Sequence, residues 1–509
     1  MPRREPLLTA SSRWPERGQA LVFTLVFIAS ASLVSLLLFN SGILANSKTR
    51  LQNAVDASAY SAGVLQARDH NFSAYTNRAM VANQASVAQI VSLKSFIEDA
   101  ADTGNRMGGG LLSSQRNIFP NFAPVWDAAK NAVVPTVNTI NSTFGGNNGA
   151  AAAMVKYLDA LILIFETAQT LHHAATIADM VMVSEEVLKK NDPNAKLSSG
   201  VFATGNLVTK VSAWAGSTQQ HRANDTSAQA DRFADLVVSR GATDRLTRNR
   251  ASVPTPFWVS TVKICPGSVF SATTFNFTHA GGTQLSTNKK RWLALDATQG
   301  AGGWICIYTC YPVPCVFGSA LGDTGGSGGG LAGRNGSYGS TSGYKNNPSE
   351  TINYGMALVV TPLPAGIRYF SKGPGSTLDS SGGLQDNYRD IRNPSVTAKN
   401  QAPEENGGAF PVTLEAERPA SSIRTSSKFL TNSMLVKMDD KLASSNMRAM
   451  ASAHSYFYRS KTNSGFTSAS WARSDGRTEI ENLFNPYWQS RLIDISQAER
   501  LGSIAEQTK

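Results

Sequence analysis

The feature that most constrains this chain is an uncharged apolar run at residues 20–39, ALVFTLVFIASASLVSLLLF. An α-helix rises ~1.5 Å per residue, so about 20 apolar residues cross a hydrocarbon core ~30 Å thick. Elsewhere the most apolar segment, around residues 158–165, is interrupted by Asp159. We therefore expect a single transmembrane helix. A cleaved secretory signal is the alternative, but its apolar core is usually only ~7–15 residues long, and Leu44-Ala45-Asn46 is a poor cleavage site.

The charges around this run predict its orientation. Basic residues flank it on both sides: Arg3, Arg4, Arg13 and Arg17 before it, and Lys48 and Arg50 after it. Lys and Arg are enriched on the cytoplasmic side of membrane helices. Arg13 and Arg17 are therefore the residues expected to hold the N-terminus in the cytoplasm, and most of the 509 residues then lie on the outer side.

Residues 40–103 are expected to continue the membrane helix as a helical stalk. No proline occurs between residues 48 and 102, and apolar side chains such as Leu51, Val55 and Ala59 recur at steps of three and four. The segment is rich in Ala, Ser and Asn, and small side chains let a second helix approach closely in or near a membrane. The alternative, which the residues leave open, is a helix that folds back on the chain's own outer domain.

The remaining chain changes character twice. Residues 150–190 keep the apolar spacing of a helix, which the Asn191-Asp192-Pro193 sequence ends, and a further helix is expected between 218 and 247. From 253 to 419 short apolar runs alternate with Gly, Pro, Asn and Ser clusters, which is typical of strands. Residues 318–347 are so rich in Gly and Ser that we expect a flexible loop there. A last helix is expected near 432–454.

These patterns predict an α+β fold, in which a single N-terminal transmembrane helix continues into a stalk and carries an extracytoplasmic helical block followed by a β-rich domain. At ~150 residues per domain, the length allows roughly three units. The expected segments are a basic cytoplasmic N-terminus (1–19), the transmembrane helix (20–39), the stalk (40–103), a linker (104–149), a helical block (150–250), a β-rich domain (251–420) that contains the 318–347 loop, and a C-terminal helical segment and tail (421–509).

All four cysteines lie in the β-rich region: Cys265, Cys306, Cys310 and Cys315. If this region is exported, its environment is oxidising and an even number of cysteines favours disulfides. We expect two bridges, and the sequence does not choose among the three possible pairings. Free thiols and a zinc site are the alternatives. The C-x3-C-x4-C spacing lacks the paired C-x2-C units of a structural zinc site, so we expect no metal.

No motif assembles a catalytic or cofactor site. The adjacent His172 and His173 point about 100° apart on a helix and do not form the i, i+4 pair that binds metal. The Gly-Gly-Ser-Gly-Gly at 325–329 matches a nucleophile elbow only formally, because it lies in the Gly/Ser-rich segment. The net charge of +11 is spread thinly, without a block of five like charges. We expect no cofactor and no nucleic-acid partner.

Three short segments carry a resemblance to a known family. They are Glu16-Arg17-Gly18-Gln19-Ala20, which leads directly into the apolar run, Leu51-Gln52-Asn53-Ala54-Val55-Asp56-Ala57-Ser58-Ala59 after it, and the closing Asn485-Pro486-Tyr487-Trp488-Gln489. In this order the first two segments, about 45 residues with the apolar run, resemble the N-terminal region of TadE/TadG-like proteins of the tight-adherence (Flp) pilus system. The last looks like a tail found in large members of that group.

The resemblance implies a bacterial inner-membrane protein with a periplasmic domain that helps to assemble a pilus or a related secretion apparatus. It implies no reaction. Two departures restrict what carries over. Phe23 stands five positions after Gly18, where peptidase-processed pilins have Glu, so we do not expect cleavage and incorporation as a pilin subunit. Residues 379–383 fail the D-x-S-x-S pattern of a von Willebrand factor A metal site, so that domain is not expected.

The leading functional expectation is a non-catalytic structural or assembly component. Its partners are other pilus or secretion membrane subunits and the lipid bilayer, with a homo-oligomer also possible. The residues expected to form the helix-packing surface for partners are Leu51, Ala54, Val55, Asp56, Ala57, Ala59 and Ala62. On this reading Ala54→Leu or Ala57→Leu weakens partner assembly without releasing the protein from the membrane.

Two other functions remain open from the sequence. In a membrane-tethered adhesin, Trp258, Trp292 and Trp304 would form a stacking platform for glycans, although buried core positions are the commoner outcome for such residues. In an exported hydrolase, acidic residues such as Asp296, Glu415 and Glu417 would have to face one another across a cleft. A glycan-binding signal favours the first of these, and a cleft with perturbed acid or base groups favours the second.

Overall fold

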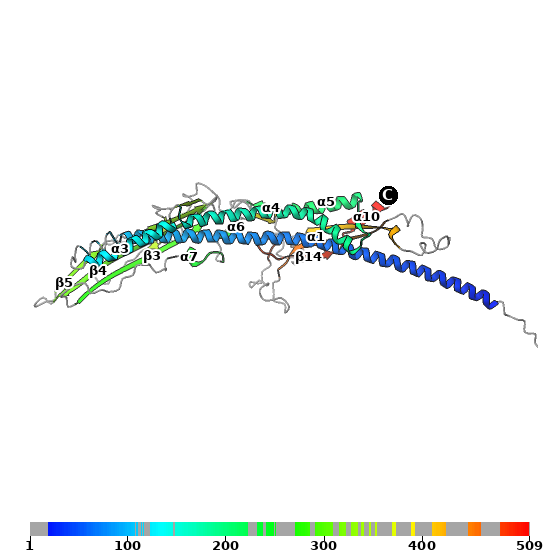
Figure 1. Ribbon diagram of the computed structural model, residues 1–509, viewed down its shortest axis with the longest axis horizontal. Helices are drawn as coiled ribbons and strands as arrows, with labels where there is room; N and C mark the ends of the chain where they lie inside the picture. Colours follow the sequence, from blue (N-terminus) through cyan, green and yellow to red (C-terminus); the bar gives the residue numbers. More distant parts are fainter. Residues whose placement is uncertain are drawn as a thin grey trace, which may run out of the picture.

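A computed structural model shows a long mixed helix-and-sheet protein built along one N-terminal helix (Figure 1). The residues that it describes are 19–106, 108–109, 113, 116, 123–145, 148–221, 232–237, 241–248, 250, 270–285, 291–308, 315–321, 327–333, 337–339, 346–347, 352–353, 369–372, 388–391, 410–423, 446–459 and 479–507.

The helix α1 (Gln19–Arg106) is continuous over 88 residues. Its first part, up to Arg50, projects from the rest of the molecule with exposed or half-exposed side chains, and from Leu51 onward one of its faces is buried (Figure 1). The expected apolar helix and stalk are therefore one element. Its end at Arg106 lies close to the boundary expected at residue 103.

A second long helix, α4 (Ala150–Asn191), runs antiparallel to α1 along the packed part of its length (Figure 1). It begins after Gly149 and ends at Asp192, as the Gly/Asn cluster and the Asn-Asp-Pro sequence predict. The shorter α5 (Val201–Ala215) follows. The expected linker 104–149 is wrong for residues 123–145, which form α3 (Ala123–Ile140) and the π-helical η3 (Asn141–Gly145). Ala-rich residues before Pro135, together with packing against α1, outweigh the proline.

The first sheet covers α1 just beyond the exposed apolar part. Its strands lie in the order β1-β12-β13-β14 and all pair antiparallel: β1 (Lys196–Leu197), β12 (Phe410–Pro419), β13 (Asn446–Phe457) and β14 (Trp488–Ile493). Ala449, Ala451 and Ala453 on β13 pack against Leu51 and Ala54 of α1. Small side chains on both surfaces therefore let the helix lie directly on the sheet.

The second sheet covers the distal half of α1 (Figure 1). Its order is β3-β4-β6-β7, and β5 also pairs with β4. The strands are β3 (Phe270–Leu285), β4 (Arg291–Tyr308), β5 (Cys315–Leu321), β6 (Ser327–Gly333) and β7 (Ser337–Gly339). In β3 and β4 the ladder places Gly281 opposite Asp296.

Short elements complete the described chain. The strand β2 (Thr218–His221) pairs with β11 (Tyr388–Ile391), and a small sheet has the order β8-β10-β9. The remaining elements are β8 (Asn346–Asn347), β9 (Ile352–Asn353), β10 (Tyr369–Lys372), α6 (Arg232–Val237), α7 (Arg245–Arg248), η7 (Ala420–Ser422) and α10 (Gln497–Gln507).

Three expected secondary-structure assignments are wrong in the described residues. The expected Gly/Ser-rich loop 318–347 contains the end of β5 and all of β6, β7 and β8. Ladder bonds of β5 and β6 to β4, of β7 to β6, and contact with α1 fix a backbone that its side chains alone would not order. The helix expected near 432–454 is strand β13 from Asn446 onward, although Ala and Met favour helix, because β13 has a partner strand on each side. Between 218 and 247 only α6 and α7 are helical, and β2 is a strand.

Two helical stretches are long and apolar enough to cross a membrane by length and composition. In the first, at the start of α1, none of the most apolar stretch is buried. The second extends over α3 and α4, is less apolar and is 28% buried in its most apolar stretch. The N-terminal stretch is thus the candidate membrane helix, on weak evidence of length and composition alone.

Candidate functional site

The buried face of α1 is unusually polar, and this face is where the structure gathers its titratable side chains. Twelve polar residues of α1 are at most 3% exposed: Ser58, Gln66, Asp69, His70, Ser73, Asn77, Gln84, Ser92, Lys94, Ser95, Asp99 and Thr103. Burying a polar group is costly unless it is hydrogen-bonded. The partners of these residues therefore identify what holds α1 to the rest of the molecule.

The first cluster centres on Asp69. Its two carboxylate oxygens accept hydrogen bonds from Nδ1 of His172 and Nδ1 of His173, both on α4, at 2.7 Å each. Asp69 and His173 are buried, whereas His172 is 38% exposed and stacks on Phe72. Two adjacent histidines thus converge on one carboxylate, because each oxygen takes one ring.

The pKa values of Asp69 and His70 show which groups of the first cluster are charged. Burial by itself raises the pKa of Asp69, but hydrogen bonds from His172 and His173 outweigh burial and lower the pKa to about 2. The neighbouring His70 is fully buried between Trp214 and Trp488, and burial lowers its pKa to about 3. At neutral pH Asp69 is therefore an anion, and His70 is an uncharged ring that packs between the two tryptophans.

Side-chain amides extend this cluster along the helix. Asn77 donates from Nδ2 to the carbonyls of Arg389 and Leu483, and Gln169 on α4 donates to Oδ1 of Asn77 at 2.7 Å. Asn71 donates to the carbonyl of Trp488 and accepts from its backbone N–H. These amides tie α1 to backbone groups of segments far away in sequence.

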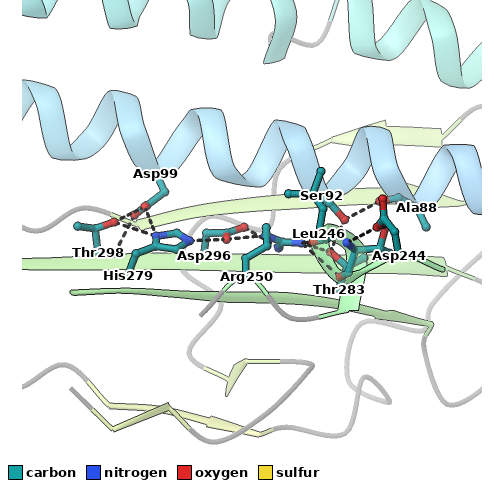
Figure 2. A network of polar contacts seen from close by, with 11 residues as sticks. Ala88, Ser92, Asp99, Asp244, Leu246, Arg250, His279, Thr283, Asp296 and Thr298 are labelled. Atoms are coloured by element: carbon teal, nitrogen blue, oxygen red, sulfur yellow. Dashed lines mark hydrogen bonds and ion pairs between the residues drawn. The ribbon is translucent and has the colours of Figure 1, made fainter. Parts of the chain in front are cut away.

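The second cluster lies further along α1, between the helix and the β3–β4 hairpin (Figure 2). Arg250 donates to both oxygens of Asp296 at 2.7 Å, a bidentate pair in which both side chains are fully buried. His279 lies between Asp296 and Asp99, with ring-nitrogen to carboxylate distances of 3.2 Å on each side. The chain of charged side chains thus runs from Arg250, which follows α7, through Asp296 and His279 of the hairpin to Asp99 of α1.

Hydroxyl and backbone groups add hydrogen bonds at both ends of this network. Thr298 donates its backbone N–H to Asp99 at 3.0 Å and its hydroxyl to the other oxygen of Asp99. At the opposite end Arg250 donates to Thr283, whose hydroxyl is 2.8 Å from that of Ser92 on α1. Both ends of the network therefore terminate on α1 (Figure 2).

The electrostatics of the second cluster favour a charged histidine. Burial lowers the pKa of His279, but contacts with Asp296 and Asp99 outweigh it and raise the pKa to about 9. Burial likewise raises the pKa of Asp296, but Arg250 and His279 outweigh it and lower that pKa. For Asp99 burial dominates and its pKa is raised. His279 therefore serves as a buried cation between two acids.

Carboxylate–histidine pairs of this kind also occur in hydrolases. The groove that the structure describes lies elsewhere, and the described residues contain no group of three or more His, Cys, Asp or Glu side chains that could hold a metal ion. The acids considered for hydrolysis are also engaged: Asp296 pairs with Arg250, and Glu415 pairs with Arg448.

A groove of about 500 Å³ opens where α1 leaves the folded body. Lys48, Gln52 and Asp56 of α1 form one wall, β13 and the end of β14 form the floor, and Arg500 and Ile504 of α10 form the other wall. It is lined by both charged and apolar side chains.

The seven residues expected to contact partner helices lie mostly inside the molecule. Five are at most 1% exposed and contact the first sheet, α4 or both: Leu51, Ala54, Val55, Ala59 and Ala62. Only Asp56 and Ala57 are partly exposed. The packing surface expected for partners is thus used within the chain, which is the alternative that the sequence left open.

The other predicted residues are only partly described. Arg13 and Arg17, as well as Cys265 and Cys310, lie outside the described residues. Cys306 belongs to β4 and Cys315 begins the adjacent β5, where it faces Tyr308 in the ladder. The two bridges stay a prediction. Trp258 lies outside the described residues, and Trp292 is buried in the core and is no surface platform.

Sequence reasoning missed the polar partners of α1. A signal was present, because Gln66, Asp69, Ser73 and Asn77 recur at steps of three and four, the spacing that a core-facing stripe normally fills with apolar residues. Arg250, His279 and Asp296, which form the second cluster with Asp99, come from distant segments, and no local pattern marks them.

Fold and site together define a mixed helix-and-sheet protein fastened by buried polar clusters to a long helix whose N-terminal part is apolar and exposed. No family model, no curated protein and no solved structure matches the chain.

Proposed function

We propose that this protein is a membrane-anchored, non-catalytic structural component of a bacterial tight-adherence (Flp-type) pilus or a related secretion apparatus. Residues 20–39 anchor it in the inner membrane as a single span, the N-terminus is cytoplasmic, and the folded body is periplasmic. The order of the Glu16–Ala20 and Leu51–Ala59 segments around the apolar run supports the assignment to this system.

One observation carries the proposal: the same uninterrupted helix supplies both the apolar anchor and the core of the body. A flexible tether would let the body move independently of the membrane. A helix held by two sheets and by α4 instead fixes the height and direction of the body relative to its anchor. A fixed position is what a scaffold needs in order to present surfaces to neighbouring subunits.

The engaged state of the buried acids supports a role without catalysis. Asp69, Asp99 and Asp296 each bridge α1 to another element, and none of them faces the groove. The hydrolase alternative needs a free acid in a cleft. The adhesin alternative needs exposed aromatic rings, and Trp292 is only 2% exposed.

The test is fractionation of cells that express the full chain with tags at residues 1 and 509. The proposal expects an uncleaved protein that resists carbonate extraction, with only the C-terminal tag open to protease from the periplasm. A mature chain that begins near residue 19 or 46, or release of the protein by carbonate, would refute the anchor. Deletion of the gene should abolish surface pili, and normal piliation of the deletion strain would refute the assembly role.

A further inference from the structure

The groove described above lies along an open edge of the first sheet. Strand β13 pairs with β12 over residues 446–455, whereas β14 pairs only with residues 452–457 of β13. At Ile493 the chain leaves the sheet and continues into α10. Among the residues that the structure describes, no strand lies beside residues 446–451 on this side, and residues 448–452 line the groove. The groove is therefore the place that a further strand would occupy.

The even-numbered residues of β13 direct their main-chain groups toward this edge. Just beyond the ladder, Tyr458 donates its N–H to the carbonyl of Tyr487, the residue before β14. The N–H and C=O groups of one residue share an edge of an antiparallel strand, and successive residues alternate between the two edges. Arg448 and Met450 lie an even number of positions before Tyr458. Their N–H and C=O groups therefore face the open edge.

Two side chains of α1 agree with this direction. Nζ of Lys48 donates to the carbonyl of Arg448, and Nε2 of Gln52 donates to the carbonyl of Met450 at 2.8 Å. Four helical residues rise ~6 Å and two strand residues span ~6.8 Å, so successive turns of α1 reach successive carbonyls of the edge. Both nitrogens are donors, so these contacts leave the N–H groups of Arg448 and Met450 facing the groove.

The groove has one wall on each face of the sheet. Ala449 and Ala451 pack against α1, whereas Arg448, on the opposite face, pairs with Glu506 of α10 at 3.4 Å. Successive side chains of a strand alternate between the two faces of its sheet. A strand added at this edge would thus turn alternate side chains toward α1 and toward α10.

The two walls favour different side chains. The wall on the α1 side is polar and consists of Lys48, Gln52 and Asp56. The wall on the α10 side has apolar surface, supplied by Met450, Ile493 and Ile504 beside Arg500 and Ser503. Ile504 is 56% exposed and has room for further contacts. A complementary strand therefore alternates polar residues, toward α1, with aliphatic residues, toward α10.

We infer that this groove binds an extended segment of a partner protein as an additional strand, antiparallel to β13 as β14 is. The segment has about six residues, enough to pair with residues 446–451, and alternates polar with aliphatic side chains. Main-chain hydrogen bonds to the edge supply the affinity, and the two walls supply the selectivity. The inference goes beyond the proposed function and does not depend on the anchoring, because it uses only residues outside the apolar run.

The experiment measures peptide binding to the full chain in detergent by fluorescence polarisation. The probe is a fluorescein-labelled pool of hexapeptides in which threonine or serine alternates with valine, isoleucine or leucine. In an antiparallel strand the residues opposite Arg448 and Met450 are the aliphatic ones, and their N–H groups point at β13. N-methylation of the aliphatic residues should therefore abolish binding, whereas N-methylation of the polar residues should leave it intact. Absence of binding, or any other pattern from the two methylated pools, would overturn the inference.

Hydrogen exchange locates the bound strand. When the unmethylated pool is added, amide exchange in residues 446–451 should slow, because the added strand covers their outward N–H groups. Exchange in α5 should stay unchanged. Protection confined to other segments would place the peptide elsewhere and contradict the inference.

The variants Met450→Pro and Met450→Leu form a matched pair. Proline removes the N–H that faces the groove, is tolerated on an open edge and should abolish binding, whereas leucine keeps the N–H and should leave binding unchanged. Gln52→Ala frees the carbonyl of Met450 for the added strand, and about fivefold tighter binding is expected from one additional hydrogen bond. A Gln52→Ala protein that binds no more tightly than wild type would count against the inference, even if Met450→Pro does not fold.

Failure of this inference and failure of the proposed function give different results. If the protein is not anchored, carbonate releases it while the peptide pool still binds. If the groove accepts no strand, the fractionation is as proposed and the polarisation does not change.

Discussion

The buried charges of this protein are tolerated because each has a partner at hydrogen-bonding distance. Arg250 and Asp296 are both fully buried and form two bonds of 2.7 Å, and His279 connects Asp296 to Asp99. Removing one member of such a chain leaves an uncompensated charge in a region that water does not reach, which typically costs ~3–5 kcal/mol. The clusters are therefore positions at which a substitution strongly lowers the stability of the fold.

The substitution Gly281→Ala tests this sensitivity by adding a single methyl group next to the Asp296 carboxylate. A Cβ at this position would overlap the Asp296 carboxylate, so Gly281→Ala must displace Asp296 from Arg250. We expect a loss of about 2–3 kcal/mol in the free energy of unfolding, measured by chemical denaturation of the detergent-solubilised protein. Gly205→Ala is the control: nothing lies within 4 Å of its added Cβ, and in helix α5 it should stabilise by about 0.5–1 kcal/mol. Equal stability of the two variants would contradict the network.

The raised pKa of His279 predicts how the free energy of unfolding depends on pH. The groups around its ring are Asp99, Asp296, Thr298 and Phe96, and its pKa is raised to about 9 from an ordinary value of 6.5. The folded state therefore holds the proton more tightly than the unfolded state. The resulting stabilisation, on the order of 3 kcal/mol, is complete below pH 6.5 and is lost as the pH rises to 9.

Denaturation curves at pH 6 and pH 9 measure this effect. The wild type should be less stable at pH 9, and His279→Gln, which removes the titrating group, should show a much smaller difference between the two pH values. A variant with the same pH dependence as wild type would show that His279 is not charged in the folded protein.

At the scale of elements, α1 and β13 meet through small side chains. Ala54 is fully buried against the sheet, whereas Ala57, one turn further along, is partly exposed. The shared surface has no space for a larger residue at Ala54, because Ala449, Ala451 and Ala453 already fill it. A larger side chain at Ala54 should therefore lower the stability of the fold itself, and a loss of partner assembly in such a variant would not by itself show a direct contact with a partner.

Ala54→Leu should overpack this interface and lower the free energy of unfolding by about 1–3 kcal/mol. Ala57→Leu should cost clearly less, and both proteins should remain in the membrane fraction, because neither change touches the apolar run. Denaturation and carbonate extraction of the two variants measure these effects. If Ala54→Leu leaves stability intact and affects only partner assembly, the surface serves partners as the sequence alone suggested.

At the scale of the whole molecule, α1 contains both the apolar run and a segment buried in the folded body. The side chains of the apolar run do not pack against that body. The side chains before residue 48 are exposed or half-exposed, so the body should fold independently of how the apolar run is solvated. Ile28→Arg combined with Leu33→Arg places two charges near the middle of that run. At ~2.5–3.5 kcal/mol per central arginine, the pair should strongly reduce membrane insertion.

The measurement is the fraction of protein that resists carbonate, together with the thermal unfolding of the body. Insertion should fall while the unfolding temperature of the body is unchanged. Ser32→Thr, an uncharged change in the same run, is the control and should remain inserted. Membrane retention of the double variant would show that another part of the chain, with the apolar stretch over α3 and α4 as the first suspect, holds the protein in place.

The helices whose apolar residues repeat at helical spacing were largely predictable from the sequence. The apolar run, the absence of proline to residue 102 and the Asn-Asp-Pro sequence after residue 190 place α1 and α4 to within a few residues. The partners of these helices were not predictable, because Asp69 finds His172 and His173 across 103 and 104 residues and Asp99 finds Thr298 across 199. Separations of this size leave no trace in a window of one helix or strand.

The sequence by itself determined that a long apolar helix begins the chain and continues as a stalk, since helix length and hydropathy are properties of neighbouring residues. Only the tertiary structure decided which face of that helix is buried, that Gly-rich residues 327–333 and Ala-rich residues 446–457 are strands, and that a polar stripe of α1 lies inside while several large apolar side chains of α4 lie outside. The physical reason is that strand pairing, charge neutralisation and burial are settled between segments, and each segment alone is compatible with more than one outcome.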